Sequence, residues 1–260
     1  MAIGGSAHAT LLKSPREIEI MARGGALLYA TLQHMKAHVR PGISTGELDA
    51  LCEAFIRSHA GAEPAFKGLY GFPGSACISI NEEIVHGIPS RKRVLLNGDI
   101  VKLDFGVKLE GMSTDSAITV PVGEIDEQTK RLLEVTKRSL DAGIAAATPD
   151  NHVGDIGAAV QSIVEAAGFA VVRELVGHGV GFSPHEELQI PNYGQAKRGK
   201  KLSVGLTIAI EPMVNLGTAK TKTLSDKWTV VTADAKRSAH FEHTVAITDH
   251  GPRILTQPIG

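Results

Sequence analysis

The chain repeats its own order of elements about halfway along, and this repeat constrains the fold more strongly than any other feature of the sequence. Pro41 and Pro149 are 108 residues apart. The segment GDIVKLD, residues 98–104, matches GLTIAIE, residues 205–211, at a spacing of 107. Such a period is too long for a solenoid. It indicates two similar α/β halves facing each other across a pseudo-twofold axis, or else a chance likeness between two helix-then-strand segments.

Each half is predicted to contain two helices followed by strands. Capping boxes at Ser14–Glu17 and Ser44–Glu47 start the first two helices. The second pair is expected over residues 127–147 and after the turn at Pro149. We expect strands near residues 76–80, 100–107, 113–120, 169–174, 207–214, 229–232 and 240–248, and an insertion near 215–228. Residues 1–260 are thus predicted to form a single domain, whose repeat covers about 14–123 and 127–249.

Four acidic residues fall in register in this repeat, inside segments that are predicted to be strands. Asp104 corresponds to Glu211, and Asp115 corresponds to Glu242. A turn near residues 109–111 would make a hairpin, with the two aspartates roughly opposite each other and their Cβ atoms about 4.5–5.5 Å apart. A single strand aspartate can be hydrogen-bonded or lie at an edge. Four converging carboxylates need cations, and they carry enough charge for two divalent ions about 3.5–4 Å apart.

Histidines supply a nitrogen ligand and further polar groups. His178 lies in GHGVG, where the glycines favour a loop and let the backbone approach a ligand. His185 follows in PHEE, and His86 precedes a turn in NEEIVHGIP. A lone histidine is more often structural than a ligand, but the neighbouring carboxylates favour a functional role for His178. An oxygen-rich set with one imidazole suits Mn²⁺, Fe²⁺ or Co²⁺ and also admits Zn²⁺.

The composition argues against several classes of protein. A net charge of −1 gives no bulk attraction to nucleic acid, and we expect no direct nucleic-acid specificity. No apolar run reaches the roughly 18 residues of a membrane span. Cys52 and Cys77 form neither a zinc spacing nor a disulfide framework, which fits a reducing compartment. We therefore expect a cytoplasmic protein with no membrane association.

Taken together, these residues resemble the type I methionine aminopeptidases over nearly the whole chain. The resemblance is carried by ISINEEIVHGIP, LNGDIVKLDFGVKLEGMSTDSA, GHGVGFSPHEE, AIEPMV and SAHFEHTVAIT. It implies the pita-bread fold of the α/β (α+β) class, with two pseudo-twofold-related α/β halves and a mainly antiparallel curved sheet covered by helices. It also implies a hydrolase that removes the N-terminal methionine from nascent proteins and peptides with a small second residue, by attack of a metal-bridging hydroxide on the first peptide bond.

The resemblance further implies roles for individual residues. Two divalent ions (Co²⁺, Mn²⁺, Fe²⁺ or Zn²⁺) would be held by Asp104, Asp115, His178, Glu211 and Glu242, with Asp115 and Glu242 bridging. Glu211 would also manage the proton of the attacking water. His86 and His185 would contact the substrate near the scissile bond and stabilise the tetrahedral intermediate. The pocket for the methionine side chain would include Phe72, Cys77 and Trp228.

A smaller set of features concerns partners. The insertion carries Lys220, Lys222 and Lys227, which by resemblance would help the protein dock on the ribosome near emerging chains. A solvated loop is the plainer interpretation of these lysines. We expect a monomer.

Three positions depart from the usual pattern of the family. Leu69 replaces an aromatic residue near the pocket, Gly106 replaces a threonine, and Pro184 changes the run before His185. Other functions also stay open at this point. They are a broader metallo-aminopeptidase, an Xaa-Pro peptidase of the same fold, a two-metal phosphoesterase, and a non-enzymatic binding protein of this fold.

Overall fold

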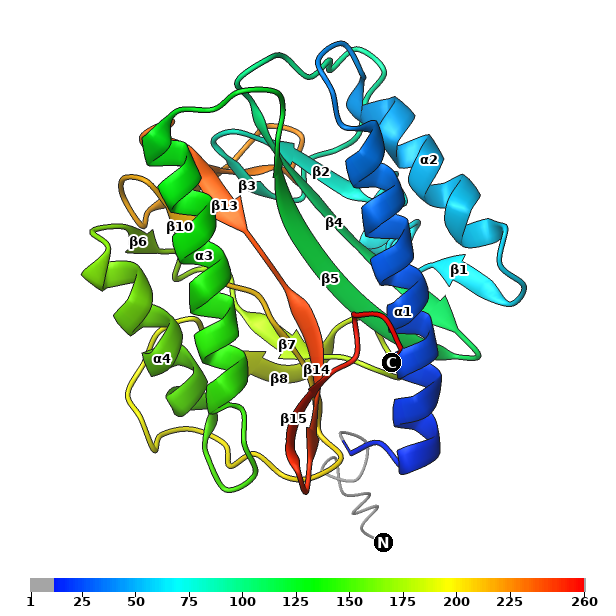
Figure 1. Ribbon diagram of the computed structural model, residues 1–260, viewed down its shortest axis with the longest axis vertical. Coiled ribbons are helices and arrows are strands. Elements are labelled where there is room, and N and C mark those ends of the chain that lie inside the picture. The colour runs from blue at the N-terminus through cyan, green and yellow to red at the C-terminus, as the bar shows by residue number, and fades with distance from the viewer. Residues whose placement is uncertain (1–11, 260) are drawn as a thin grey trace, which may run out of the picture.

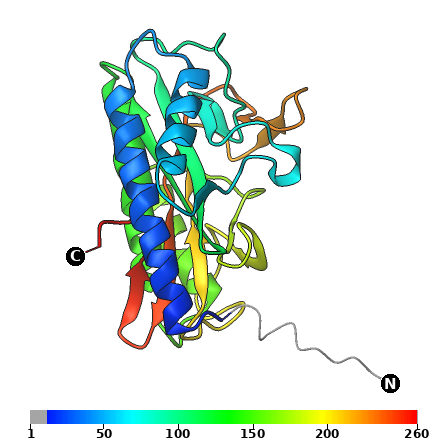
Figure 2. The same cartoon turned by 90° about the vertical axis from the view of Figure 1, so that its right-hand side faces the viewer.

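The computed structural model describes residues 12–259 and shows helices layered on a curved sheet (Figure 1). Helices α1 (Pro15–His38) and α2 (Thr45–Arg57) cover the first half of the sheet, and α3 (Glu127–Ala146) and α4 (Val153–Ala166) cover the second. Figure 2 shows that the helices lie on one face and that loops project from the other. This two-layer arrangement of two α/β halves confirms the predicted fold class.

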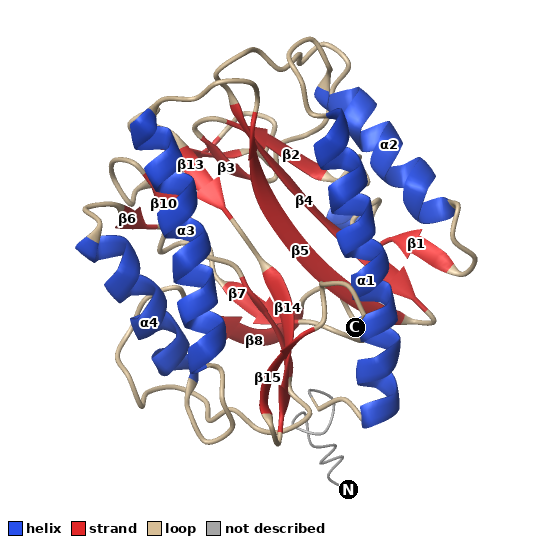
Figure 3. Ribbon diagram, viewed as in Figure 1, coloured by secondary structure: helices blue, strands red, loops and turns tan. Residues whose placement is uncertain are grey.

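The strands form the layer behind the helices (Figure 3), and every pairing between them is antiparallel. The first-half sheet has the order β1-β4-β2, with β5 paired to β4, and the second-half sheet has the order β15-β14-β9-β7-β8. The remaining strands form two small sheets, β13-β10-β6 and β11-β12-β3. The strand bounds are β1 (Ala62–Pro64), β2 (Cys77–Ile80), β3 (Glu83–Val85), β4 (Ile100–Leu109), β5 (Met112–Pro121), β6 (Ala170–Val171), β7 (Gly177–Gly179), β8 (Glu186–Ile190), β9 (Thr207–Ile210), β10 (Met213–Asn215), β11 (Thr221–Thr223), β12 (Val230–Thr232), β13 (Ser238–His240), β14 (His243–Thr248) and β15 (Gly251–Ile254).

The first two helices begin at the predicted capping boxes. The Glu17 backbone N–H donates to Ser14 Oγ at 3.4 Å, and the Ser14 N–H donates to Glu17 Oε2 at 2.7 Å. Ser44 and Glu47 make the same pair of bonds at 3.2 and 2.9 Å. These reciprocal bonds satisfy backbone donors that the first helical turn leaves unpaired, so each helix starts at a defined residue.

Strand β4 is buried on both faces, and its side chains point alternately to the helix side and to the opposite side of the sheet. Val101, Leu103 and Phe105 belong to the core packed under α1 and α2. Lys102 and Asp104, the even-numbered neighbours, therefore point to the opposite face of the sheet. An aspartate in this strand is thus compatible with folding, because it does not enter the helix-side core.

The β4–β5 hairpin forms as predicted, but its register differs from the one we expected. Asp104 pairs with Ala117, and Asp115 pairs with Gly106. The two aspartates are therefore diagonal neighbours on one face and not directly opposite each other, which corrects the prediction. The reason is the tight turn at Glu110 and Gly111, both with positive φ, which closes the hairpin with two residues and sets the pairing.

Two long strands predicted in the second half are each interrupted at an acidic residue. The predicted strand 207–214 breaks between β9 and β10 at Glu211 and Pro212, because proline has no N–H for a sheet ladder. The predicted strand 240–248 breaks between β13 and β14 at Phe241 and Glu242. The predicted strand near 169–174 shortens to β6.

Side-chain hydroxyl groups join the two halves along β5. Ser116 Oγ donates to the Glu242 carbonyl at 2.6 Å, and Thr119 Oγ1 donates to the His240 carbonyl at 2.7 Å. Thr244 Oγ1 donates to the Asp115 carbonyl at 2.7 Å. The backbone at Asp115 and at Glu242 is thus held in a fixed relative position by hydroxyl-to-carbonyl hydrogen bonds between the two halves.

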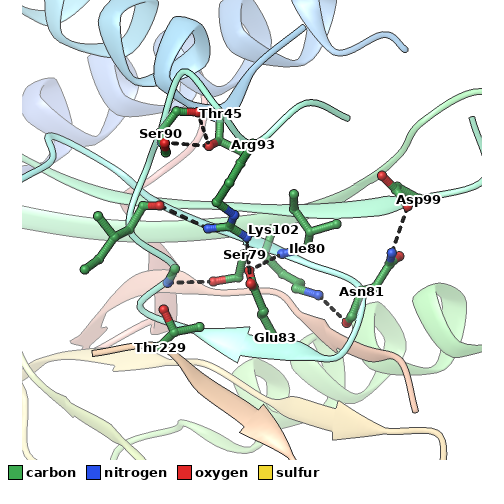
Figure 4. Close-up of polar contacts among 12 residues, drawn as sticks. Thr45, Ser79, Ile80, Asn81, Glu83, Ser90, Arg93, Asp99, Lys102 and Thr229 are labelled. Atoms are coloured by element: carbon green, nitrogen blue, oxygen red, sulfur yellow. Dashed lines mark hydrogen bonds and ion pairs between the residues drawn. The ribbon is translucent and has the colours of Figure 1, made fainter. Parts of the chain in front are cut away.

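Lys102 makes a second connection between the halves on the same face of β4 as Asp104. Its Nζ donates to the Asn81 carbonyl at 2.7 Å (Figure 4) and to the Ser238 carbonyl at 3.0 Å. The side chain is fully buried, and this burial lowers the pKa of Lys102 to about 7. Two carbonyl acceptors compensate part of the cost of burying the ammonium group.

The second half has its own core beneath α3 and α4. Leu140 and Ile156 from these helices pack with Ile208 of β9 and Val245 of β14. Cys52 lies in the first core, and both Cys52 and Cys77 are buried and unpaired. Within residues 12–259, none of the helices has both the length and the apolar character that crossing a membrane requires.

Candidate metal centre and adjoining pocket

Five side chains from five different elements converge on the face of the sheet opposite the helices. Asp104 comes from β4, Asp115 from β5 and His178 from β7, while Glu211 follows β9 and Glu242 precedes β14. The potential ligand atoms of Asp104, Asp115 and Glu242 lie within 4.8 Å of one another, as do those of His178, Glu211 and Glu242. The structure therefore brings together all five residues that the sequence proposed as ligands, with Glu242 common to both groups.

Burial makes this cluster unfavourable for four bare carboxylates. Burial and the other acids of the cluster raise the pKa values of Asp104, Glu211 and Glu242 well above the ordinary range. Burial raises the pKa of Asp115 to about 7. Asp115 Oδ1 and Glu242 Oε1 are buried without a hydrogen-bond partner among the described residues. A divalent cation would bind the unpaired acceptor atoms and offset the repulsion between the carboxylates. The donor set therefore fits the metal ions that the sequence predicts.

His178 presents one nitrogen to the carboxylates and is held by the other. Its Nδ1 lies 2.9 Å from the Gly179 carbonyl, which can only accept, so Nδ1 carries the proton. Its Nε2 lies 3.5 Å from Glu211 Oε1 and 3.8 Å from Asp115 Oδ2. Burial lowers the pKa of His178 to about 4, so the ring is neutral and Nε2 is free to act as a ligand.

The glycines around His178 lie in a strand and not in a loop, so the predicted loop at this position is wrong. Gly177 and Gly179 both lie in β7, paired with β8 and β9. A Cβ on Gly177 would approach the Ala209 carbonyl oxygen at 2.3 Å, so only glycine permits this close pairing. His185 does lie in a loop, the one between β7 and β8.

His240 belongs to the site but was not among the predicted residues. The side chain is fully buried, and neither ring nitrogen has a hydrogen-bond partner among the described residues. Its Nε2 lies 3.4 Å from Glu211 Oε2. Burial lowers the pKa of His240 to about 3, so the ring is neutral. Its position two residues before Glu242 was the available signal in the sequence.

A cavity of about 320 Å³ opens beside the acidic cluster. Every predicted site residue lines it: His86, Asp104, Asp115, His178, His185, Glu211, Glu242, Phe72, Cys77 and Trp228. The Trp228 ring packs edge-on against Phe72 at 5.1 Å and against His86 at 6.4 Å, measured between ring centroids. Phe66, Tyr70, Leu175 and Met213 also line the wall and were not predicted. The pocket therefore combines an apolar wall with an acidic end.

A polar network holds the segment that presents His86 (Figure 4). Glu83 on β3 accepts from Arg93 at 2.6 Å and from the Ile80 N–H at 2.7 Å. Gly87, next to His86, donates its N–H to Ser79 Oγ at 3.0 Å. A Cβ on Gly87 would meet the Ile78 carbonyl oxygen at 2.3 Å, so the chain passes too closely for any other residue. His86 itself has φ 60, and burial lowers its pKa to about 4.

One of the three unusual positions has a structural explanation. A Cβ at Gly106 would lie 2.9 Å from both Ala65 Cβ and the Thr114 carbonyl oxygen, so a threonine does not fit this backbone. Leu69 lines the cavity. Pro184 lies in the loop before His185 and is not among the residues that line the cavity.

The raised carboxyl pKa values predict how metal binding changes stability with pH. In the metal-free protein these groups bind protons more tightly when folded. Their contribution to stability is therefore present below the unfolded pKa of about 4 and is lost as the pH rises through the folded value, about 7 for Asp115. We expect added divalent ions to raise the melting temperature of chelated protein more at about pH 8 than at about pH 5.5. Scanning calorimetry checks this, and an equal or larger gain at the lower pH would contradict it.

Comparison with known proteins places this site in a defined class. The sequence matches metallopeptidase family M24 over residues 19–249, and the chain belongs to that family. Methionine aminopeptidase 1 of Bacillus subtilis is 52% identical over 247 residues, covering 95% of this chain and 99% of that protein. The crystal structure of methionine aminopeptidase from Thermotoga maritima superimposes with a TM-score of 0.92 at 41% identity, covering 95% of this chain and 98% of that one. Within family M24 the chain thus groups with the methionine aminopeptidases.

A prolidase from Pyrococcus horikoshii shares the fold but is more distant. It superimposes with a TM-score of 0.78 at 22% identity, and this chain covers 65% of it. That likeness shows a common fold alone.

Proposed function

We propose that this chain is a metal-dependent exopeptidase that removes the N-terminal methionine from nascent proteins and peptides with a small second residue. The observation that carries the proposal is that the apolar cavity and the carboxylate cluster form one continuous site. At about 320 Å³ the cavity is near the lower end of the usual range for ligand pockets, so it admits a chain end and not a long segment. The identity to methionine aminopeptidases supports the same substrate.

Asp104, Asp115, His178, Glu211 and Glu242 would hold two divalent ions. When bound, such ions polarise a carbonyl group and lower the pKa of a water molecule, which supplies a nucleophile at neutral pH. The donor set suits Co²⁺, Mn²⁺, Fe²⁺ or Zn²⁺, since oxygen-rich sites with one imidazole admit all four.

The protein's own groups position the substrate and move protons. The walls around Phe72, Cys77 and Trp228 bind the unbranched thioether side chain, which places the first peptide bond beside the acidic cluster. Glu211 takes the proton of the attacking water and delivers it to the leaving amine. Burial lowers the pKa of His86 to about 4, and desolvation in the cavity also lowers the pKa of His185, although that residue keeps an exposed surface. A neutral imidazole at either position can donate one N–H to the substrate carbonyl region.

The experiment that tests this function compares peptides that differ only in residue one, each followed by alanine. A hydrophobic pocket discriminates by about 10–200-fold per methylene-sized difference. We expect methionine to give the highest kcat/KM, norleucine to be tolerated, and leucine to be much poorer because it branches at Cγ. Equal rates for leucine, phenylalanine or lysine would favour a broader metallo-aminopeptidase. Cleavage of only Xaa-Pro peptides or of phosphoesters would favour the other functions left open by the sequence.

The role of His185 is tested separately from metal binding. We expect His185→Ala to lower kcat by about 10²-fold, as for loss of a transition-state hydrogen-bond donor, with metal content unchanged. Steady-state kinetics and metal analysis by mass spectrometry check the two halves of this expectation. Loss of metal from the variant would show that His185 is a ligand, a role its closeness to His178 and Asp115 also allows.

The proposal extends to the cellular setting. Lys220, Lys222 and Lys227 are exposed around the β11–β12 hairpin, and Figure 2 shows this segment on the face of the sheet away from the helices. Their charge would attract ribosomal phosphate near emerging chains. We propose that the protein works in the cytoplasm as a monomer. Co-sedimentation with ribosomes and sedimentation velocity of the free protein test these two points.

A further inference from the structure

Tyr70 combines two unfavourable features that packing does not explain. The residue is 74% exposed, the highest value among the exposed large hydrophobic residues of the described range 12–259. Its backbone is left-handed, with φ 51 and ψ 18, in the turn η1 (Leu69–Gly71). An L-residue with a large side chain rarely adopts this conformation without a functional reason. Gly68 and Gly71, at φ 82 and 88, share the left-handed geometry that turns the ring outward.

The Tyr70 ring lies at the open end of the active-site cavity. It lines the cavity and stacks on His185, with centroids 6.0 Å apart and planes 26° from parallel. Phe66, which is buried, stacks on the same His185 ring at 6.3 Å. These rings form a row from the interior to solvent, and Figure 2 shows the 69–71 turn projecting from the face away from the helices.

Under the proposed function, the peptide substrate passes the Tyr70 ring. An exopeptidase of this kind binds the first residue inside the cavity, so the rest of the peptide must leave through the mouth. We propose that Tyr70 is a specificity residue that forms a binding shelf for the peptide chain beyond the second residue. A tyrosine suits this task, because its flat face packs against chain atoms of any sequence while its hydroxyl stays in water. The inference rests on the proposed function and adds a preference for peptide length.

The test measures kcat/KM for the dipeptide Met-Ala and for a pentapeptide that begins with Met-Ala. The quantity of interest is the ratio of the pentapeptide value to the dipeptide value. Tyr70→Asn is the informative variant, since asparagine tolerates left-handed backbone and removes the ring without disturbing the turn. We expect this variant to lower the ratio about threefold to tenfold, mainly through KM, as for loss of one aromatic contact. Tyr70→Phe keeps the ring face and should keep the ratio.

Controls separate this role from a structural one. Leu96, 64% exposed and absent from the cavity wall, provides a matched surface truncation, and Leu96→Ala should leave the ratio unchanged. The melting temperature of Tyr70→Asn should not fall, because the ring makes little buried contact. If Tyr70→Asn keeps the ratio within twofold of the parent, or lowers kcat/KM equally for both peptides, the proposed role of Tyr70 in peptide binding is wrong. If the metal-loaded parent releases methionine from neither peptide, the proposed function itself fails.

Discussion

Replacing Glu211 by glutamine should lower kcat by about 10²–10⁴-fold while the protein still folds. Glutamine keeps the shape of the side chain but cannot accept a proton, and it is a weaker ligand. Burial raises the pKa of Glu211 because a charged carboxylate is unfavourable there. Glutamine carries no charge and avoids this cost, so the metal-free variant should melt no lower than the metal-free parent. Steady-state kinetics and thermal melting measure the two effects.

Metal analysis of the same variant separates the two roles of Glu211. A variant that keeps its metal and loses activity identifies Glu211 as the proton carrier, whereas a variant that loses metal identifies it first as a ligand. Glu134→Gln on the exposed side of α3 is the matched control and should behave like the parent. Activity of Glu211→Gln within threefold of the parent would remove Glu211 from the mechanism.

Removing divalent ions should abolish activity, and returning one of them should restore it. Asp104, Asp115 and Glu242 are nearly inaccessible to solvent, so without cations they must either repel each other or take up protons. Neither state reproduces the charge distribution that activates water. Methionine release is measured on dialysed protein, on the same protein with added Mn²⁺, Co²⁺, Fe²⁺ or Zn²⁺, and with Mg²⁺ as a comparison. Full activity in protein that mass spectrometry shows to be free of metal would contradict the account.

The parts of the fold that follow from local pattern could be predicted from the sequence. The capping boxes at Ser14 and Ser44 involve residues three apart, so their signal is contained in a few letters. The four acidic ligands could be proposed because acidic residues are unusual inside apolar strands and recur in the repeat, and His178 because it lies between glycines in a chain with such carboxylates. Their convergence in the structure agrees with that reasoning, and their ligand roles stay predictions until a metal is seen.

Features that depend on contacts between distant segments could not be predicted. The diagonal placement of Asp104 and Asp115 depends on hairpin register, and the strand at His178 depends on pairing of β7 with β8 and β9. His240 could be assigned to the site only from the structure, which places its Nε2 3.4 Å from Glu211 Oε2. Tyr70 shows the same limit, because neither its exposure nor its left-handed backbone can be derived from the neighbouring residues alone.

The most direct test of the central claim is anomalous diffraction from crystals of the protein grown with Mn²⁺ and measured at two wavelengths across the manganese edge. The account predicts two anomalous peaks enclosed by Asp104, Asp115, His178, Glu211 and Glu242, with Asp115 and Glu242 contacting both. Active protein whose crystals show no anomalous peak within this group, or show manganese only elsewhere on the chain, would contradict it.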